Sequence, residues 1–179
     1  MKIFYLIVCL LLLAGCKTPE ARKPESVQSG SFIKESAERN KKLNEKEYAQ
    51  IKSIISKDTI NTYLASESGF WYRYDVQIEK DTIQAQFGDV INFDYNLKDL
   101  NGVTIYTSTE IGNQDYIMDK QELFTGLREG LKLMKPGESV TFLFPSQKAF
   151  GYYGDKNRIG TNVPLISDVT LNSIEKTEN

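Results

Sequence analysis

The chain contains no histidine, and this absence excludes several kinds of chemistry. Serine or cysteine nucleophiles activated by an imidazole are ruled out, as is a zinc or copper site with histidine ligands. Neither Gly-x-Gly-x-x-Gly nor a P-loop motif occurs, so no glycine-rich loop is available to bind phosphates. We therefore expect neither a metal nor a cofactor.

Cysteine is scarce and neither sign of charge dominates. The sequence has 2 cysteines, and 22 Lys and Arg residues are set against 24 Asp and Glu. Without an excess of Lys and Arg the chain lacks the positive charge that is typical of nucleic-acid-binding proteins, so we do not expect nucleic acid as a partner. The hydrophobic content of 40% and aromatic content of 11% are enough for the core of one modest domain.

The N-terminal apolar run, residues 3–13, is shorter than the ~20 residues that a membrane-spanning helix needs. It ends in Leu13-Ala14-Gly15-Cys16, which resembles the lipobox of bacterial lipoproteins. The resemblance implies a signal peptide over residues 1–15, cleavage before Cys16 and lipid on its thiol and amine, which anchors the chain stably to a membrane. An ordinary signal peptide with a chance cysteine is the alternative. After cleavage only one cysteine remains, so no disulfide can form.

Residues 16–31 are polar and contain Pro19, Pro24 and Gly30, a composition that predicts a flexible, lipidated tether. Residues 32–65 are then expected to form a helical extension. Asn44–Glu47 has the Asn-x-x-Glu form of a capping box, which predicts a helix over residues 45–56 and allows a more polar helical stretch before it. Its apolar stripe consists of Tyr48, Ile51 and Ile55.

This predicted helix has two interpretations. It packs on the side of its own domain, or it docks a partner or a second copy of the chain. A single short apolar stripe normally serves the core of its own domain, and this favours the first interpretation. The sequence leaves the oligomeric state open.

From Gly69 onward the pattern predicts an antiparallel sheet interrupted by one helix. Ile91, Phe93, Tyr95 and Leu97 alternate with polar residues, so we expect Tyr95 to face inward with the others. Asn101-Gly102 predicts a hairpin turn. The helix covers residues 123–134, and the strands cover residues 70–76, 89–97, 103–107, 139–144 and 165–174. This order of elements predicts an α+β fold.

The segment that begins at Asp155 starts like a calcium-binding loop. Ile159 and Ile166 stand at its fifth and twelfth positions, where calcium requires oxygen ligands. We therefore interpret the segment as a solvated loop.

Several short motifs in residues 66–176 occur together in a characteristic order. They are Ser68–Tyr72, Gly88–Val90, Ile105–Thr107, Gly126–Leu131, Met134–Glu138 and Ala149–Gly151. Their order and spacing resemble those of FKBP-type peptidyl-prolyl isomerases. With the lipobox, tether and helix, the chain is similar to the FKBP-type isomerase lipoproteins associated with gliding motility.

The resemblance implies an FKBP-like half-barrel, an antiparallel five-stranded sheet wrapped around one short helix, with an N-terminal helical extension. It also implies a pocket between the helix and the loops. The implied catalytic residues are Tyr95, Tyr106 and Phe150, and the implied substrate-binding residues are Thr107, Leu123, Phe124, Leu127 and Ile159.

The sequence departs from the family pattern at several positions. Thr107 stands where the family usually has Asp, Phe150 where it has Tyr, and Leu127 where Trp is common. Ser167 replaces an aromatic residue that often closes the pocket, and Gly160-Thr161 replaces a usual proline pair.

The implied function is a membrane-anchored prolyl isomerase that faces the periplasm. Its partners would be proline-containing polypeptides, in particular exported envelope proteins such as motility or secretion components. The alternative is a catalytically weak FKBP-like module that binds a proline-containing segment. Thr107 and Phe150 favour the module, whereas the intact aromatic wall and Gly151 favour the enzyme.

Overall fold

The computed structural model describes residues 29–79 and 83–177. The predicted signal peptide, the lipidation site Cys16 and all but the end of the tether lie outside the described residues. The chain divides into two compact units, Met1–Ala37 and Glu38–Asn179, and we refer to the second as the domain. None of the helices in the described ranges is long and apolar enough to cross a membrane.

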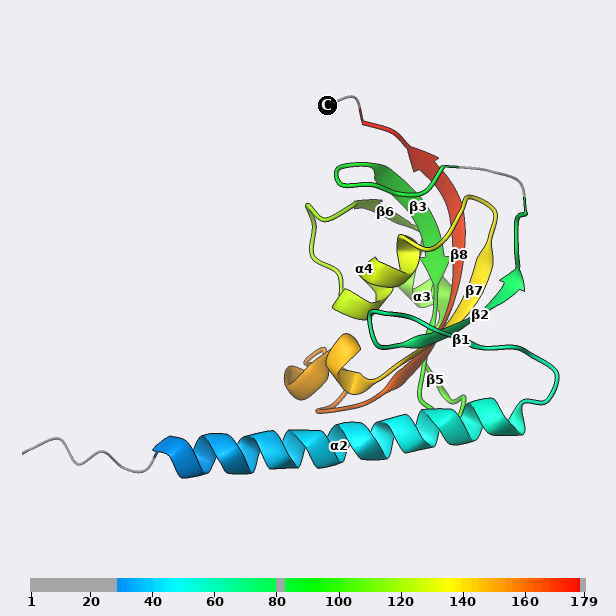
Figure 1. The fold of residues 1–179 in the computed structure, drawn as a ribbon. Helices are drawn as coiled ribbons and strands as arrows, with labels where there is room; N and C mark the ends of the chain where they lie inside the picture. The colour runs from blue at the N-terminus through cyan, green and yellow to red at the C-terminus, as the bar shows by residue number, and fades with distance from the viewer. Residues whose placement is uncertain (1–28, 80–82, 178–179) are drawn as a thin grey trace, which may run out of the picture. The chain divides into compact units, whose positions relative to one another are not determined.

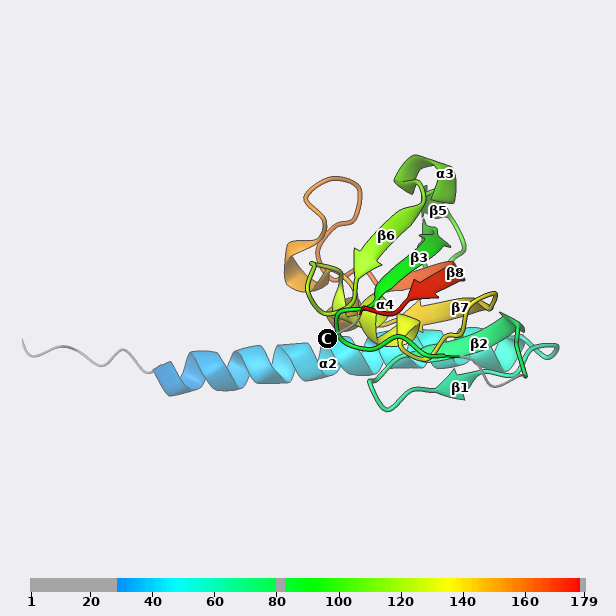
Figure 2. The ribbon, with the colours of Figure 1, turned by 90° about the horizontal axis from the view of Figure 1, so that it is seen from above.

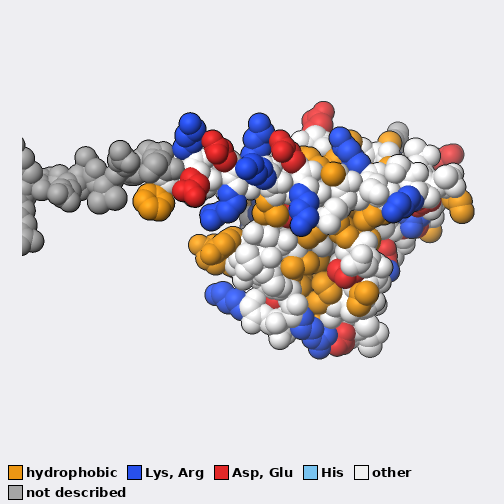
Figure 3. Space-filling model, turned by 90° about the horizontal axis from the view of Figure 1, so that it is seen from below, with side chains coloured by type: hydrophobic (Ala, Val, Ile, Leu, Met, Phe, Trp, Pro, Cys, Tyr) orange, Lys and Arg blue, Asp and Glu red, His pale blue; other side chains and the backbone are white. Residues whose placement is uncertain are grey.

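Helix α2 (Ser29–Lys57) is longer than the sequence pattern predicted. The capping-box interpretation of Asn44 is wrong, because the helix runs through this residue, and the tether prediction is wrong at its end, where Ser29 and Gly30 are already helical. The Glu, Lys and Arg residues before Asn44 have high helix propensity and extend the helix toward the N-terminus. Basic and acidic side chains are interspersed along its exposed surface (Figure 3).

Within the domain, α2 packs on the sheet. Ile51 is fully buried, and the ring of Tyr48 meets Trp71 edge-on with 5.2 Å between centroids. The apolar stripe of this helix therefore serves its own domain, the first of the two interpretations above.

Within residues 29–79 and 83–177 the sheet has eight strands and is antiparallel at every pairing, which confirms the predicted fold class (Figures 1 and 2). Its main order is β1-β2-β7-β8-β3-β6, and β4 pairs with β5 and β8. The strands are β1 (Leu64–Ala65), β2 (Trp71–Val76), β3 (Val90–Tyr95), β4 (Leu97–Lys98), β5 (Thr104–Tyr106), β6 (Gln114–Ile117), β7 (Ser139–Phe144) and β8 (Leu165–Glu175).

The count exceeds the five predicted strands for local reasons. The segment predicted as 89–97 is divided at Asn96 into β3 and β4, and the two-residue β1 and the polar β6 had no strand signal in the sequence. The predicted hairpin lies between β4 and β5. Gly102 adopts φ +83° in its turn, and the carboxylate of Asp99 accepts hydrogen bonds from the backbone N–H groups of Asn101 (2.8 Å) and Val103 (2.9 Å).

Helix α4 (Thr125–Leu131) lies against the concave side of the sheet (Figure 1) and is shorter than the predicted 123–134. It ends because the N–H groups of Leu133 and Met134 bond three residues back in a tight last turn. Leu127, Leu131 and Met134 are each 0% exposed, so α4 and its last turn are anchored in the core.

The two helical glycines allow the close approach of α4 to the sheet. A Cβ atom at Gly126 would lie 2.5 Å from Cδ1 of Phe144, and one at Gly130 would lie 2.8 Å from Cε1 of Phe142. These two phenylalanines stack on each other at 5.3 Å along β7. The main core is completed by Phe70, Ala85, Ile91, Phe93, Tyr116, Met118, Val140, Val169, Leu171 and Ile174.

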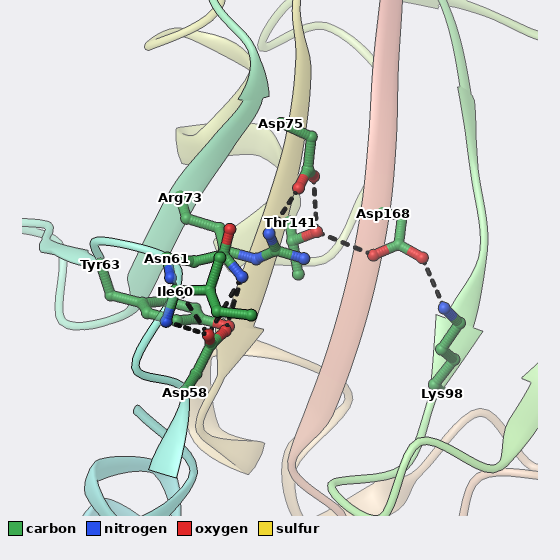
Figure 4. A network of polar contacts seen from close by, with 9 residues as sticks. All are labelled: Asp58, Ile60, Asn61, Tyr63, Arg73, Asp75, Lys98, Thr141 and Asp168. Atoms are coloured by element: carbon green, nitrogen blue, oxygen red, sulfur yellow. Dashed lines mark hydrogen bonds and ion pairs between the residues drawn. The ribbon is translucent and has the colours of Figure 1, made fainter. Parts of the chain in front are cut away.

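The opposite face of the sheet carries a row of charged and hydroxyl side chains (Figure 4). Arg73 pairs with Asp75 at 2.8 Å and Lys98 with Asp168 at 2.6 Å. The Thr141 hydroxyl lies between the two carboxylates, 2.7 Å from Asp75 and 2.9 Å from Asp168. Burial alone would raise the pKa of Asp168, but its hydrogen bonds, led by that from Lys98, lower it. This row ties β2, β7, β8 and β4 together across the sheet.

Candidate functional site

A cleft of about 560 Å³ opens beside the start of α4. Its walls come from the end of β3, the segment before α4, and the loop between β7 and β8. The lining residues are Tyr95, Gln121, Glu122, Leu123, Phe124, Arg128 and Phe150. The structure thus gathers four of the eight predicted site residues, Tyr95, Leu123, Phe124 and Phe150, around one cleft.

Tyr95 reaches the cleft from the last position of β3. Its neighbours on the same strand face, Ile91 and Phe93, are at most 1% exposed, and its ring stacks on Phe93 with centroids 5.5 Å apart. Burial raises the pKa of the Tyr95 phenol. The hydroxyl therefore stays protonated near neutral pH and can donate a hydrogen bond at the edge of an apolar wall.

Two phenylalanines form the apolar wall itself. Phe124 is the N-cap residue of α4, directly before the helix, and the centroid of its ring lies 5.4 Å from that of Phe144 and 5.1 Å from that of Phe150. Phe150 lies between two short 3₁₀ helices, η1 (Ser146–Lys148) and η2 (Gly151–Tyr153). Gly151 has φ +58°, a left-handed conformation that glycine adopts without strain and that turns the chain directly after Phe150.

Leu127, Ile159 and Tyr106 lie behind or beside this wall. Leu127 is 0% exposed and belongs to the main core, so it supports the cleft from within. Ile159 belongs to a smaller buried cluster against which Tyr106 and Phe150 pack.

Tyr106 is held by the loop that follows η2. Its hydroxyl donates to the carboxylate of Asp155, a hydrogen bond that raises the pKa of the phenol. Asn157 donates to the same hydroxyl at 3.0 Å, and the Arg158 guanidinium lies 4.8 Å from the ring centroid. The Asp155 carboxylate also accepts from the backbone N–H of Ile159 at 2.8 Å. Asp155 therefore fixes the conformation of this loop, which the sequence analysis interpreted only as a solvated loop.

Thr107 lies outside the cleft and has a local structural role. It is the N-cap of α3 (Ser108–Ile111), and its side chain accepts a hydrogen bond from the backbone N–H of Glu110. The Glu110 carboxylate accepts in return from the Thr107 backbone at 2.9 Å, which completes a capping box. The threonine side chain is thereby engaged in the cap of α3.

Polar residues that the sequence interpretation missed form part of the cleft's lining. They are Gln121, Glu122 and Arg128. Arg128 lies 3.5 Å from Asp119 and 3.6 Å from Glu129. Its position four residues after Phe124 was the available signal, because residues four apart share a helix face. The cleft therefore combines an apolar wall with charged and amide groups.

Comparisons with known proteins agree with this architecture. A family model described as FKBP-type peptidyl-prolyl cis-trans isomerase matches residues 81–172. A probable FKBP-type peptidyl-prolyl cis-trans isomerase FkpA from Neisseria meningitidis serogroup B is 30% identical over 135 residues, 75% of this chain and 47% of that protein. A probable FKBP-type isomerase from Haemophilus influenzae is 29% identical over 106 residues, 59% of this chain and 43% of that protein. The chain spans about half the length of these curated relatives.

Solved structures show the same fold. A peptidyl-prolyl cis-trans isomerase from Pseudomonas syringae pv. tomato superimposes with a TM-score of 0.62 at 16% identity, over 76% of this chain and 96% of its own. FkpA from Escherichia coli gives a TM-score of 0.59 at 19% identity, over 99% of this chain and 84% of its own. The domain thus has the fold of this class of isomerases. By the family match, the chain belongs to the FKBP-type peptidyl-prolyl cis-trans isomerase family.

Proposed function

We propose that the domain catalyses cis/trans isomerisation of X-Pro peptide bonds in polypeptide clients, with the proline in the cleft between Tyr95, Phe124 and Phe150. The observation that carries this proposal is the aromatic wall of the cleft, in which Phe124 and Phe150 pack at 5.1 Å. Among the described residues that line the cleft there is no serine, threonine or cysteine. The site is thus suited to a reaction in which no covalent bond is made.

The physical basis is the electronic change in the amide. Rotation about the peptide bond has a barrier of ~18–20 kcal/mol because the twisted amide loses its resonance. Twisting also reduces the charge separation of the amide, so an apolar, water-poor wall favours the twisted state relative to the planar one. The Tyr95 hydroxyl can add a hydrogen bond to the bound segment.

The test is the cis/trans exchange rate of a proline-containing tetrapeptide with and without the purified protein. We expect exchange clearly faster than the uncatalysed process, which takes tens of seconds or more. A rate equal to background would refute the proposal.

A binding module without strong catalysis is the second candidate function. Two observations favour it: Phe150 brings no hydroxyl to the cleft, and the Thr107 side chain is engaged in the cap of α3. This candidate predicts that the exchange rate equals background and that a separate binding measurement still detects proline-containing peptides.

We further propose that the chain is anchored by lipid at Cys16 to the cell-envelope membrane, faces the periplasm and serves exported envelope proteins. Leu13-Ala14-Gly15-Cys16 supports this part of the proposal. Cys16→Ser should abolish incorporation of labelled fatty acid, and equal labelling of variant and wild type would contradict it.

A role in gliding motility or secretion is a prediction from the sequence resemblance. The relatives named above are described as isomerases, and their descriptions mention neither process. Slower gliding or secretion after loss of the chain would support the role, and unchanged behaviour in both assays would contradict it.

A further inference from the structure

A buried carboxylate joins helix α2 to the loop that carries Phe150. Glu47 is 2% exposed and Ser146 is 1% exposed. One oxygen of Glu47 accepts from the backbone N–H of Ser146 at 2.8 Å, and the other accepts from its hydroxyl at 2.7 Å. Hydrogen bonds to a charged acceptor are among the stronger ones in proteins, and burial keeps water from competing with them.

The contact has a direct route to the cleft. Ser146 begins η1, its carbonyl accepts from the N–H of Ala149 at 3.0 Å, and the carbonyl of Pro145 accepts from Lys148 at 2.8 Å. Phe150 follows these turns immediately. Fixing Ser146 therefore fixes the start of a short hydrogen-bonded segment whose next side chain lines the cleft.

The same segment is limited on its other side by α4. The missing side chain of Gly126 leaves room for the backbone carbonyl of Lys148, since a Cβ atom there would lie 2.7 Å from that oxygen. Gln147 reinforces the α2 side through hydrogen bonds with Tyr48 (3.1 Å) and Asn44 (3.3 Å). The loop is thus held between the two helices.

We propose that Glu47 is a positioning residue for the cleft. Through Ser146 it holds the loop so that Phe150 packs against Phe124 and completes the aromatic wall. The inference rests on the proposed isomerase function for its kinetic consequence, and on the hydrogen bonds alone for its structural one. Helix α2 thereby contributes to the shape of the substrate site.

The test compares three variants of the full chain. Glu47→Ala removes both acceptors. Glu47→Gln keeps an acceptor for the Ser146 N–H and can donate to the Ser146 hydroxyl oxygen, so it is the conservative rescue. Glu45→Ala removes a glutamate whose side chain is 64% exposed on the same helix, and it is the matched control.

Three readouts separate positioning from simple loss of structure. They are kcat/KM on a proline tetrapeptide, hydrogen exchange of the amides of residues 146–150, and the emission of Trp71. Trp71 is the one tryptophan of the sequence and contacts Tyr48 of α2, so its emission reports whether the helix stays docked.

For Glu47→Ala we expect kcat/KM to fall about tenfold, amide exchange to accelerate, and Trp71 emission to stay unchanged. Glu47→Gln and Glu45→Ala should stay within about twofold of wild type, because their changes leave the loop anchored or lie outside it. Wild-type kinetics and exchange in Glu47→Ala would overturn the inference. A loss of activity that appears only with shifted Trp71 emission would overturn it as well.

Two further measurements cover the cases in which Glu47→Ala does not fold or the wild type has no isomerase activity. If Glu47→Ala does not fold, Ser146→Ala removes one of the two hydrogen bonds and should lower kcat/KM about threefold, and an unchanged rate would overturn the inference. If the wild type has no isomerase activity, the proposed function fails on its own, and amide exchange decides this inference. Faster exchange at residues 146–150 in the Glu47 or Ser146 variant then supports it, and unchanged exchange refutes it.

Discussion

Replacing Phe150 with alanine tests the aromatic wall most directly. The ring packs on Phe124 at 5.1 Å, a pair contact worth about 0.5–1.5 kcal/mol beyond the area it buries. A comparable contact to a twisted proline amide, together with the exclusion of water, gives about 1.4–2 kcal/mol in the transition state. This corresponds to a fall in kcat/KM of about 10- to 30-fold. Because Phe150 lies on a surface loop, the free energy of unfolding should fall by only about 1–2 kcal/mol, less than for a fully buried ring.

The assay is kcat/KM for cis/trans exchange of a proline tetrapeptide, measured beside thermal melts. Phe150→Leu keeps an apolar group and should lose no more than about threefold in kcat/KM. Tyr153→Ala is the control on the same loop, because Tyr153 is 80% exposed and is not among the cleft's lining residues. If Phe150→Ala retains the wild-type rate while staying folded, the cleft described above is not where isomerisation occurs.

Three further predictions concern the cleft, the core and an exposed cap. Tyr95→Phe should lower kcat/KM by no more than about fivefold, since it removes one hydrogen bond of about 1 kcal/mol and keeps the wall; a hundredfold loss would assign the hydroxyl a central role. Gly126→Ala should lower the free energy of unfolding by about 1–2 kcal/mol in denaturant melts, because overlap with Phe144 outweighs the gain in helix propensity of up to about 1 kcal/mol; a stabilised variant would contradict the close approach of α4. The pKa of the Glu110 carboxyl is lowered from 4.5 to about 2, first by the hydrogen bond from the Thr107 backbone and then by the ion pair between Glu110 and Arg158. The ionised Glu110 therefore contributes to stability above pH 4.5, and this contribution is lost as pH falls toward 2. Glu110→Gln should flatten the acid side of a plot of Tm against pH. Identical plots for the variant and the wild type would contradict the cap.

Regular burial patterns were readable from the sequence. Phe93 and Leu97 alternate with polar residues and are both buried, and β7 begins and ends at the predicted residues, Ser139 and Phe144. In a strand that is buried on one face, apolar and polar residues alternate, and this alternation specifies the register of the strand in the sheet. Strand β6 has no such pattern, and its pairing with β3 is a tertiary contact that local sequence does not encode.

The cleft was readable only in part. Tyr95 and Phe150 could be assigned from the family resemblance, whereas Arg128 was missed although the predicted helix over residues 123–134 already placed it four residues after Phe124. Thr107 carries a second, local signal. Thr107 and Glu110 have the Thr-x-x-Glu form of a capping box, and the structure contains this cap; the assignment of Thr107 to substrate stays a prediction from the resemblance.

The central place of β8 determines the order in which the sheet can be completed. It is the last of the described strands in the chain, yet it pairs with both β7 and β3 and also contacts β4. Until residues 165–175 have emerged from the ribosome, β3 and β7 each lack a neighbour along one edge and expose hydrogen-bonding groups there. The partnership with β3 also joins residues about 80 positions apart, from Val90 opposite Glu175 to Tyr95 opposite Val169, which slows closure of the sheet. A nascent chain stalled before Leu165 is therefore an unfinished sheet with two open edges, and only the arrival of the final strand joins its halves.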